Sequence, residues 1–233
     1  MHQAAPRWDP RDQPSYTLKE AALYVALPAS TVRAWTMGQL YPTSREGRKL
    51  APPLLVPARK APPVLSFWNL VEIYVLASIR REHAVSMPRV RKALSFVENK
   101  LKVRRPLISE QFFTDGVDLF VERYSKLMSA SADGQLAVRD LLVGALKRID
   151  RDPKGLATRV FPWIDSTGEP RTVEIDPARA FGRLVVAGTG IPTESIAERF
   201  RAGDSIGDLA ADFRLTQEQI ESALRWEQRA SVA

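Results

Sequence analysis

The spacing of apolar and polar residues between Tyr16 and Gly38 predicts two short helices separated by a tight turn. Thr17 and Glu20 form the signature of a capping box, in which the two side chains satisfy free backbone N–H groups at a helix start. Pro28 ends this helix because it has no N–H to donate. The apolar residues between these points recur at helical intervals and share one face; they are Leu18, Ala21, Ala22 and Val25.

The second helix of this pair is expected from Ala29 to Met37, with Val32 and Trp35 facing the first helix. Gly38 is then expected to be a left-handed cap. The pattern is typical of a DNA-reading helix-turn-helix, and an ordinary helical hairpin is the alternative. The side chains expected on the outer face are of kinds that hydrogen-bond phosphates and base edges; they are Ser30, Thr31, Arg33 and Thr36.

The stretch from Gln39 to Leu65 combines six prolines with a basic cluster around the apolar run 54–56. We expect a hairpin or wing whose cations lie along a phosphate backbone and add affinity that does not depend on sequence. A disordered proline-rich loop is the alternative. The basic residues are Arg45, Arg48, Lys49, Arg59 and Lys60.

Two further helices are predicted after the wing. Ser66 caps one that runs from Phe67 to about Glu82, and Ser86 with Pro88 opens another that runs to about Lys102. This order of elements resembles the MerR-like winged helix family, in YTLKEAALYV, in STVRAW and in LSFWNLVEIYVLASIRREHAVSMPRVRKAL. The wing is longer and richer in proline than the wing of that family.

From Arg105 to about Ile175 the pattern changes to short runs typical of β-strands. Two of them, Gln111–Thr114 and Val117–Val121, are joined by Asp115-Gly116, which predicts a hairpin. We expect a small sheet with a helix packed on it, serving connection or dimerisation or forming a ligand-sensing pocket. The other elements expected here are strands at Leu127–Ser131, Ala157–Phe161 and Val173–Ile175 and a helix at Val138–Ile149.

The last segment, from Phe181, predicts a short strand followed by three short helices in a homeodomain-like cluster. Their inward residues are expected to be Ile196, Ala197 and Phe200, then Ile206, Leu209, Ala210 and Phe213, then Ile220, Ala223 and Leu224. The capping residues are Thr193 and Gly203 for the first helix, Asp204 or Ser205 for the second, and a Thr216–Gln219 box for the third.

The run from Gly182 through GTGIPT to LTQEQIESAL is similar to the domain of unknown function 433 family. That family carries an arginine where Gly190 stands and a glycine where Ala187 stands. The resemblance implies a VapB-type antitoxin whose partner is a PIN-like ribonuclease toxin. It also implies that the antitoxin occludes the acidic, metal-binding active site of the toxin. An arginine inserted among those carboxylates would supply a charge-assisted pair; the candidates are Arg183, Arg214, Arg225 and Arg229.

These elements predict a mainly α protein with a small β component, of the α+β class. The expected parts are a flexible arm at 1–14, a winged helix-turn-helix at 15–104, a connecting or dimerisation module at 105–180 and an antitoxin domain at 181–233.

The distribution of charge strengthens the DNA interpretation. Residues 1–105 hold 18 Lys and Arg against 7 Asp and Glu, whereas the rest of the chain is slightly acidic and the total is +7. A basic block that coincides with a reading motif is what nucleic-acid binding requires. Cysteine is absent, and no apolar run approaches the roughly 20 residues of a spanning helix. A cytoplasmic protein without a membrane partner is therefore expected.

The sequence contains few residues of the kinds that catalyse reactions. The two histidines are His2 and His83, so that a triad or a histidine metal site would have to be built around His83. The segment 188–190 lacks the third glycine and the lysine of a phosphate loop, and a tight turn explains it better. The aspartates four residues apart from Asp204 to Asp212 invite a metal hypothesis, but a solvated acidic face explains them better. We expect no enzyme activity, cofactor or metal.

The leading hypothesis is an antitoxin of a type II toxin-antitoxin pair that binds its toxin and its own double-stranded operator. A homodimer is expected because twofold proteins match palindromic operators. One alternative is a stand-alone MerR-like transcriptional regulator with a ligand-sensing or dimerisation domain. Another is an adaptor that binds only protein. The residues assigned to DNA are Ser30, Thr31, Arg33 and Thr36 on the helix and Arg45, Arg48 and Lys49 on the wing.

Overall fold

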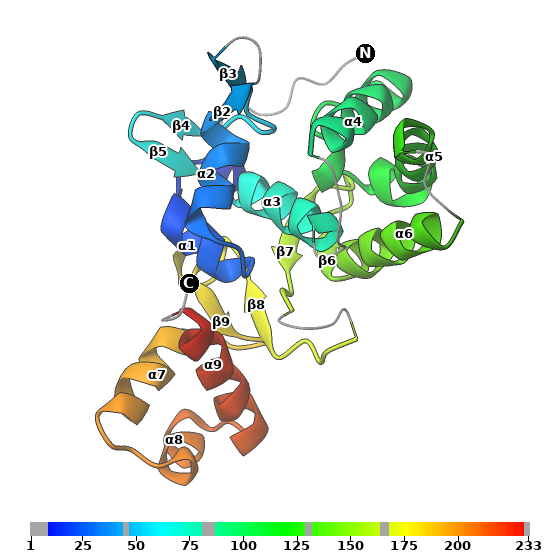
Figure 1. Cartoon of the computed structure of the whole chain (residues 1–233). Helices are drawn as coiled ribbons and strands as arrows, with labels where there is room; N and C mark the ends of the chain where they lie inside the picture. The colour runs from blue at the N-terminus through cyan, green and yellow to red at the C-terminus, as the bar shows by residue number, and fades with distance from the viewer. Residues whose placement is uncertain (1–8, 44–46, 81–86, 129–131, 164–167, 231–233) are drawn as a thin grey trace. The chain divides into compact units, whose positions relative to one another are not determined.

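The computed structural model describes residues 9–43, 47–80, 87–128, 132–163 and 168–230 (Figure 1). Its helices and short strands confirm a mainly α fold with a small β component. The chain divides into two compact units, one of Met1–Leu70 with Arg171–Ala233 and the other of Val71–Pro170. The two end segments of the chain therefore share one unit.

The first unit opens with the predicted helix-turn-helix, α1 (Leu18–Tyr24) and α2 (Ala29–Met37). The capping box is confirmed, since the N–H of Thr17 donates to Glu20 Oε2 at 2.7 Å and the N–H of Glu20 donates to Thr17 Oγ1 at 3.2 Å. α1 ends one turn before the predicted proline stop because Ala26 has a left-handed φ of 53°, which a right-handed helix cannot accommodate.

Two small antiparallel sheets accompany these helices. β2 (Gln39–Thr43) and β3 (Gly47–Ala51) form a hairpin, which confirms a hairpin at the predicted wing. β1 (Tyr16–Thr17), β5 (Pro63–Leu65) and β4 (Arg59–Lys60) form a three-stranded sheet in that order. This sheet brings the chain back to the start of the helix-turn-helix. The 3-10 turn η1 (Pro10–Asp12) precedes β1.

α3 (Phe67–Arg80) begins in the first unit, where Ser66 Oγ accepts the N–H of Asn69 at 3.1 Å as the predicted cap. It continues into the second unit, where α4 packs on α5 and α5 on α6. The elements of the second unit after α3 are α4 (Met87–Leu101), η2 (Pro106–Ile108), η3 (Phe112–Gly116), α5 (Val117–Met128), α6 (Ala132–Lys147) and the antiparallel strands β6 (Ile149–Arg151) and β7 (Ala157–Val160).

The hairpin predicted around Asp115-Gly116 is wrong, because these residues form a π-helical turn that leads into α5. Phe112 and Phe120 are fully buried at helical spacing. A Cβ on Gly116 would lie 2.7 Å from the Phe112 ring, so this glycine permits close packing and does not mark a turn. Leu127 also lies in α5, so the strand predicted there is wrong, and residues 129–131 fall outside the described part.

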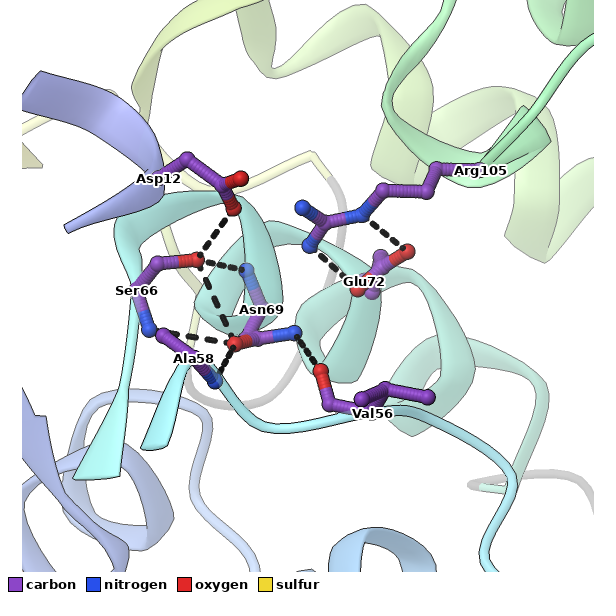
Figure 2. A network of polar contacts seen from close by, with 7 residues as sticks. All are labelled: Asp12, Val56, Ala58, Ser66, Asn69, Glu72 and Arg105. Atoms are coloured by element: carbon purple, nitrogen blue, oxygen red, sulfur yellow. Dashed lines mark hydrogen bonds and ion pairs between the residues drawn. The ribbon is translucent and has the colours of Figure 1, made fainter. Parts of the chain in front are cut away.

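Two arginines, one buried and one half-buried, stabilise the second unit. Arg148, which is 4% exposed, donates to the carbonyls of Phe161 at 2.7 Å and Glu169 at 2.6 Å. Arg105 donates two hydrogen bonds to the carboxylate of Glu72, from Nε to Oε1 at 3.0 Å and from Nη2 to Oε2 at 2.8 Å (Figure 2). Removing one member of such a pair leaves a desolvated charge, which makes these contacts structural.

The C-terminal segment of the first unit contains the predicted strand and three helices. Seven apolar residues form its core: Val186, Ile196, Ala197, Leu209, Ile220, Ala223 and Leu224. The strands predicted at 157 and 173 and the helix predicted near 138 are also confirmed. The elements of this segment are β8 (Val173–Ile175), η4 (Ala180–Gly182), β9 (Leu184–Val186), α7 (Thr193–Arg201), α8 (Ile206–Phe213) and α9 (Gln217–Ala230).

Two of the three predicted caps in this segment are confirmed. Ser205 caps α8, and Thr216 and Gln219 exchange hydrogen bonds of 2.9 and 3.2 Å at the start of α9. Thr193 is not the cap of α7, whose N-cap is the preceding proline. Its buried hydroxyl donates instead to Glu227 Oε1 at 2.6 Å, which joins the start of α7 to α9.

The helix-turn-helix meets the C-terminal segment through two tyrosines of the first unit. Tyr16 is 3% exposed and lies against Gly182, where no room is left for a Cβ. Tyr24 stands edge-on to Tyr16, with ring centroids 6.1 Å apart, and lies close to the backbone of Leu184. Burial raises the pKa of Tyr24 to about 12. Residues some 160 positions apart thus share one core.

Candidate nucleic-acid interface

Buried side chains and main-chain bonds hold α2 in place. Val32 and Trp35 are 0% and 4% exposed, which confirms the predicted inward face. The carbonyl of Trp35 accepts the N–H groups of Leu54 at 2.7 Å and Leu55 at 3.0 Å. The segment that leaves the β2–β3 hairpin is therefore tied to the end of α2.

The outward face of α2 carries three of the four residues predicted there. Ser30 and Arg33 are exposed and Thr31 is half-buried. Ser30 and Thr31 lie in the first turn, where free N–H groups and the helix dipole favour an anion such as a phosphate. Arg33 has no carboxylate partner within the described residues. This face resembles the N-terminal part of a recognition helix, which reaches base edges.

Thr36 does not lie on that face, and its predicted placement is wrong. It is 1% exposed and its hydroxyl donates to the Val32 carbonyl at 2.8 Å. Thr36 follows Val32 by four residues, so it shares the inward face of the helix. That spacing was the signal that would have placed it correctly.

The β2–β3 hairpin begins directly after α2. Gly38 makes this possible, since its φ is 81° and a Cβ there would lie 2.7 Å from the carbonyl oxygen of Ala51. Arg48 and Lys49 are exposed in β3, with no carboxylate partner in the described chain. Because neighbouring residues of a strand point to opposite faces, their charges project from both sides of the hairpin. Arg45 lies outside the described residues.

Asn69, which the sequence pattern did not single out, positions β4, the second strand with exposed basic residues. It is 1% exposed; its Oδ1 accepts the N–H groups of Ala58 and Ser66, at 3.0 and 3.1 Å, and its Nδ2 donates to the Val56 carbonyl at 2.9 Å (Figure 2). These bonds fix the start of β4, where Arg59 and the next residue, a lysine, are exposed. A polar residue three positions after a cap, within an apolar run, was the available signal.

The acidic side chains described near these basic residues bind other groups of the same segment. Each of the three carboxylates described between residues 9 and 70 has a partner. Asp9 pairs with Arg11 at 2.7 Å, Glu20 belongs to the capping box, and Asp12 accepts the Ser66 hydroxyl at 3.4 Å. The exposed cations of α2, β3 and β4 therefore dominate the local field, which favours a polyanion.

The C-terminal aspartates bind an arginine. Arg199 donates to Asp204 at 2.6 Å and to Asp212 at 2.7 Å, while Asp208 accepts the hydroxyl of Ser205. Within the described ranges, no group of three His, Cys, Asp or Glu side chains is placed to hold a metal ion. His83 falls outside those ranges. Segment 188–190 forms the expected tight turn, in which the N–H of Thr189 bonds the Val186 carbonyl at 3.0 Å.

The arginines assigned to toxin contact lie at separate places in the C-terminal segment. Arg183 precedes β9, Arg214 ends α8 with a left-handed φ of 55°, and Arg225 lies on α9; all three are exposed. The side chain of Arg229 is outside the described part. Among the helices that the structure describes, none has the length and apolar character needed to cross a bilayer.

Two segments of the chain match family models. Residues 173–226 match the family described as protein of unknown function (DUF433), and residues 14–94 match a putative DNA-binding helix-turn-helix domain. The first match confirms the resemblance stated for the C-terminal segment. The second covers both α2 and the β2–β3 hairpin, so the candidate interface lies within the matched helix-turn-helix region.

Whole-chain comparisons agree with these matches. The chain is 26% identical over 239 residues to Putative antitoxin VapB45 of Mycobacterium tuberculosis, covering 91% of this chain and 93% of the relative. It is also 26% identical over 233 residues to Uncharacterized protein Rv2308 of that organism, covering 95% and 93%. A crystal structure of Rv2018 from Mycobacterium tuberculosis matches with a TM-score of 0.66 and 24% identity, over 94% of this chain and 100% of that one, and shows a shared fold.

Proposed function

We propose that this chain is the antitoxin of a type II toxin-antitoxin pair, which binds the operator of its own operon and inhibits a PIN-like ribonuclease. The proposal rests mainly on one observation. A helix-turn-helix with exposed basic residues and the segment that matches the DUF433 model lie in the same compact unit. Similarity to a putative antitoxin over nine-tenths of the chain supports it.

In this proposal the outward face of α2 enters the major groove. Arg33 reads base edges, and Ser30 and Thr31 contact a base or a phosphate at the helix start. Arg48 and Lys49 of β3, with Arg45, follow the phosphate backbone. Thr36 is left out because its hydroxyl is buried and bonded within the helix. A homodimer would place two such faces on the half-sites of a palindrome.

In this proposal the C-terminal segment binds and inhibits the ribonuclease. The active site of such a toxin is acidic and holds a metal, and an arginine inserted among its carboxylates would form a charge-assisted pair. Arg183, Arg214 and Arg225 are exposed enough to serve. The acidic residues Glu218 and Glu221 on α9 are also exposed and would repel phosphates, which favours a protein contact for that helix.

The test is to express the tagged chain from its native operon, to identify by mass spectrometry what co-purifies, and to footprint the operon promoter. A co-eluting ribonuclease that is inactive in the complex and regains activity on separation is the expected result. A chain that purifies alone and still protects its promoter would replace this proposal with the stand-alone regulator. A chain that binds no duplex even at low salt would leave only the protein-binding adaptor.

A further inference from the structure

Phe181 is an apolar side chain held out in solvent. It is 95% exposed, whereas the other large apolar side chains that stand out from the described surface are between 38% and 70% exposed. A phenyl ring so placed adds no packing to the fold. It exposes apolar area at the one tip where the chain turns between β8 and β9.

The backbone that carries this ring is in an unfavourable conformation. Ala180 and Phe181 have φ values of 44° and 56°, in the left-handed region that residues with a Cβ avoid. Such strain persists only where the surrounding structure imposes it, and it gathers at functional sites. The next residue, Gly182, is held against Tyr16, which prevents the turn from relaxing on that side.

Hydrogen bonds make the tip rigid. The N–H of Arg179 donates to the Asp176 carbonyl at 2.9 Å, and that of Gly182 donates to the Arg179 carbonyl at 2.8 Å. The N–H of Arg183 donates to the Ala180 carbonyl at 3.1 Å. A ring presented on a rigid turn loses little conformational entropy when it binds, which suits an anchor residue.

The charges beside the ring indicate the kind of surface it fits. Arg179 is held by the buried Glu174 at 3.1 Å and by Asp176 at 3.8 Å. Arg183 is exposed and has no carboxylate partner in the described chain. The tip therefore offers an apolar ring next to an unpaired cation. A second copy docked about a twofold axis would bring Arg183 toward itself, which disfavours self-association here.

We propose that Phe181 is the anchor by which this chain docks on its protein partner, inserting into an apolar pocket whose rim carries a carboxylate that pairs with Arg183. The inference rests on the proposed function, in which that partner is the ribonuclease toxin, and it locates the contact on the β8–β9 tip. A few buried residues, often aromatic side chains or arginines in well-packed pockets, carry most of the affinity of protein interfaces.

The test compares the full-length wild type with Phe181→Ala, with Arg183→Ala and with the matched control Leu136→Ala, which removes a side chain that is 58% exposed in the second unit. Each is expressed with the native operon, and partner affinity, operator affinity and thermal midpoint are measured. We expect Phe181→Ala to weaken partner binding by about 30-fold or more. Its operator affinity and thermal midpoint should match the wild type, since the ring touches neither site nor core.

A photo-crosslinking phenylalanine analogue at position 181 identifies the occupant. A crosslink to an apolar site beside Asp or Glu on a co-purified protein supports the proposal. If the wild type captures a ribonuclease and Phe181→Ala captures it equally well, the anchor is refuted while the proposed function stands. If the crosslinked protein has no ribonuclease activity, the anchor stands and the proposed function fails. A crosslink to a second copy of this chain, or no captured protein at all, refutes the anchor.

Discussion

The phenol of Tyr16 lies against the backbone of Gly182, so closely that a Cβ on this glycine has no space. Tyr16 starts the helix-turn-helix segment, and Gly182 ends the turn before β9 in the DUF433 segment. The Tyr16 hydroxyl is buried and has no hydrogen-bond partner among the described atoms. The contact is therefore one of packing, and it joins the two segments that the proposed function combines.

Replacing Gly182 by Ala should lower the free energy of unfolding by about 2–4 kcal/mol, because the new methyl meets Tyr16 and the φ of 76° is unfavourable for alanine. Gly188→Ala is the matched control, since it has a φ of 77° and open space around it, and should cost only about 1–2 kcal/mol. Urea denaturation measures both. Equal losses in the two variants would show that the Tyr16 contact contributes nothing.

Tyr16→Phe should leave the stability of the protein unchanged or slightly higher, because the hydroxyl it removes is buried without a partner. It should also reduce the cost of Gly182→Ala, since part of the clash involves that oxygen. A double-mutant cycle in urea measures this coupling. Simple additivity of the two changes would contradict the packing described here.

Tyr24 should make the protein sensitive to alkali. Burial disfavours its phenolate and raises its pKa from 10.0 to about 12 in the folded state. The stability due to the neutral phenol is therefore fully present below pH 10 and is lost as the pH rises towards 12. Urea denaturation between pH 8 and pH 12 should show a steeper decline for the wild type than for Tyr24→Phe. Parallel declines would mean that Tyr24 ionises as freely in the folded as in the unfolded protein.

Arg33→Ala should weaken binding to the operator by about 10- to 100-fold and binding to unrelated duplexes much less, because a base contact carries sequence information. Fluorescence anisotropy with operator and scrambled duplexes at one salt concentration measures both. Arg225→Ala, which removes an exposed arginine from α9, is the control and should change neither. Equal losses on both duplexes would assign Arg33 to the phosphate backbone.

The double change of Arg48 and Lys49 to Ala should weaken operator and unrelated duplexes alike. Each phosphate contact contributes about one unit to the slope of log affinity against log salt, so the slope should fall by about 2. A salt titration of wild type and variant measures it. An unchanged slope would remove the β2–β3 hairpin from the DNA interface.

Asn69→Ala should lower the free energy of unfolding by about 2–4 kcal/mol, because it leaves the N–H of Ala58 and the carbonyl of Val56 without their partner. DNA affinity should fall as well if β4 contributes to the basic surface, since the start of that strand loses its support. Denaturation and anisotropy on the same preparation distinguish the two effects. Asn99→Ala, at an exposed position on α4, is the control and should be nearly neutral.

The sequence alone determined the features that depend on neighbours along the chain. The Thr17–Glu20 and Thr216–Gln219 boxes, the span of α2 and most inward residues of the last three helices follow from local hydrogen bonds and helical periodicity. Phe200 was wrongly expected to face inward, since it is 38% exposed at the edge of that core. Such local features are the same in every fold that contains them. The helix-turn-helix and the DUF433 segment could therefore be recognised without any knowledge of how they pack.

Features that depend on residues far apart in the sequence could be seen only in the folded protein. Gly116 was mistaken for a turn because its close approach to Phe112 within the packed second unit is not encoded in a dipeptide. The buried role of Asn69 depends on the return of the chain at Val56 and Ala58. Phe181 is exposed because Gly182 behind it is packed on Tyr16, a residue from the other end of the chain. Side-chain packing of this kind is a property of the folded whole, since each contact exists only when both partners are in place.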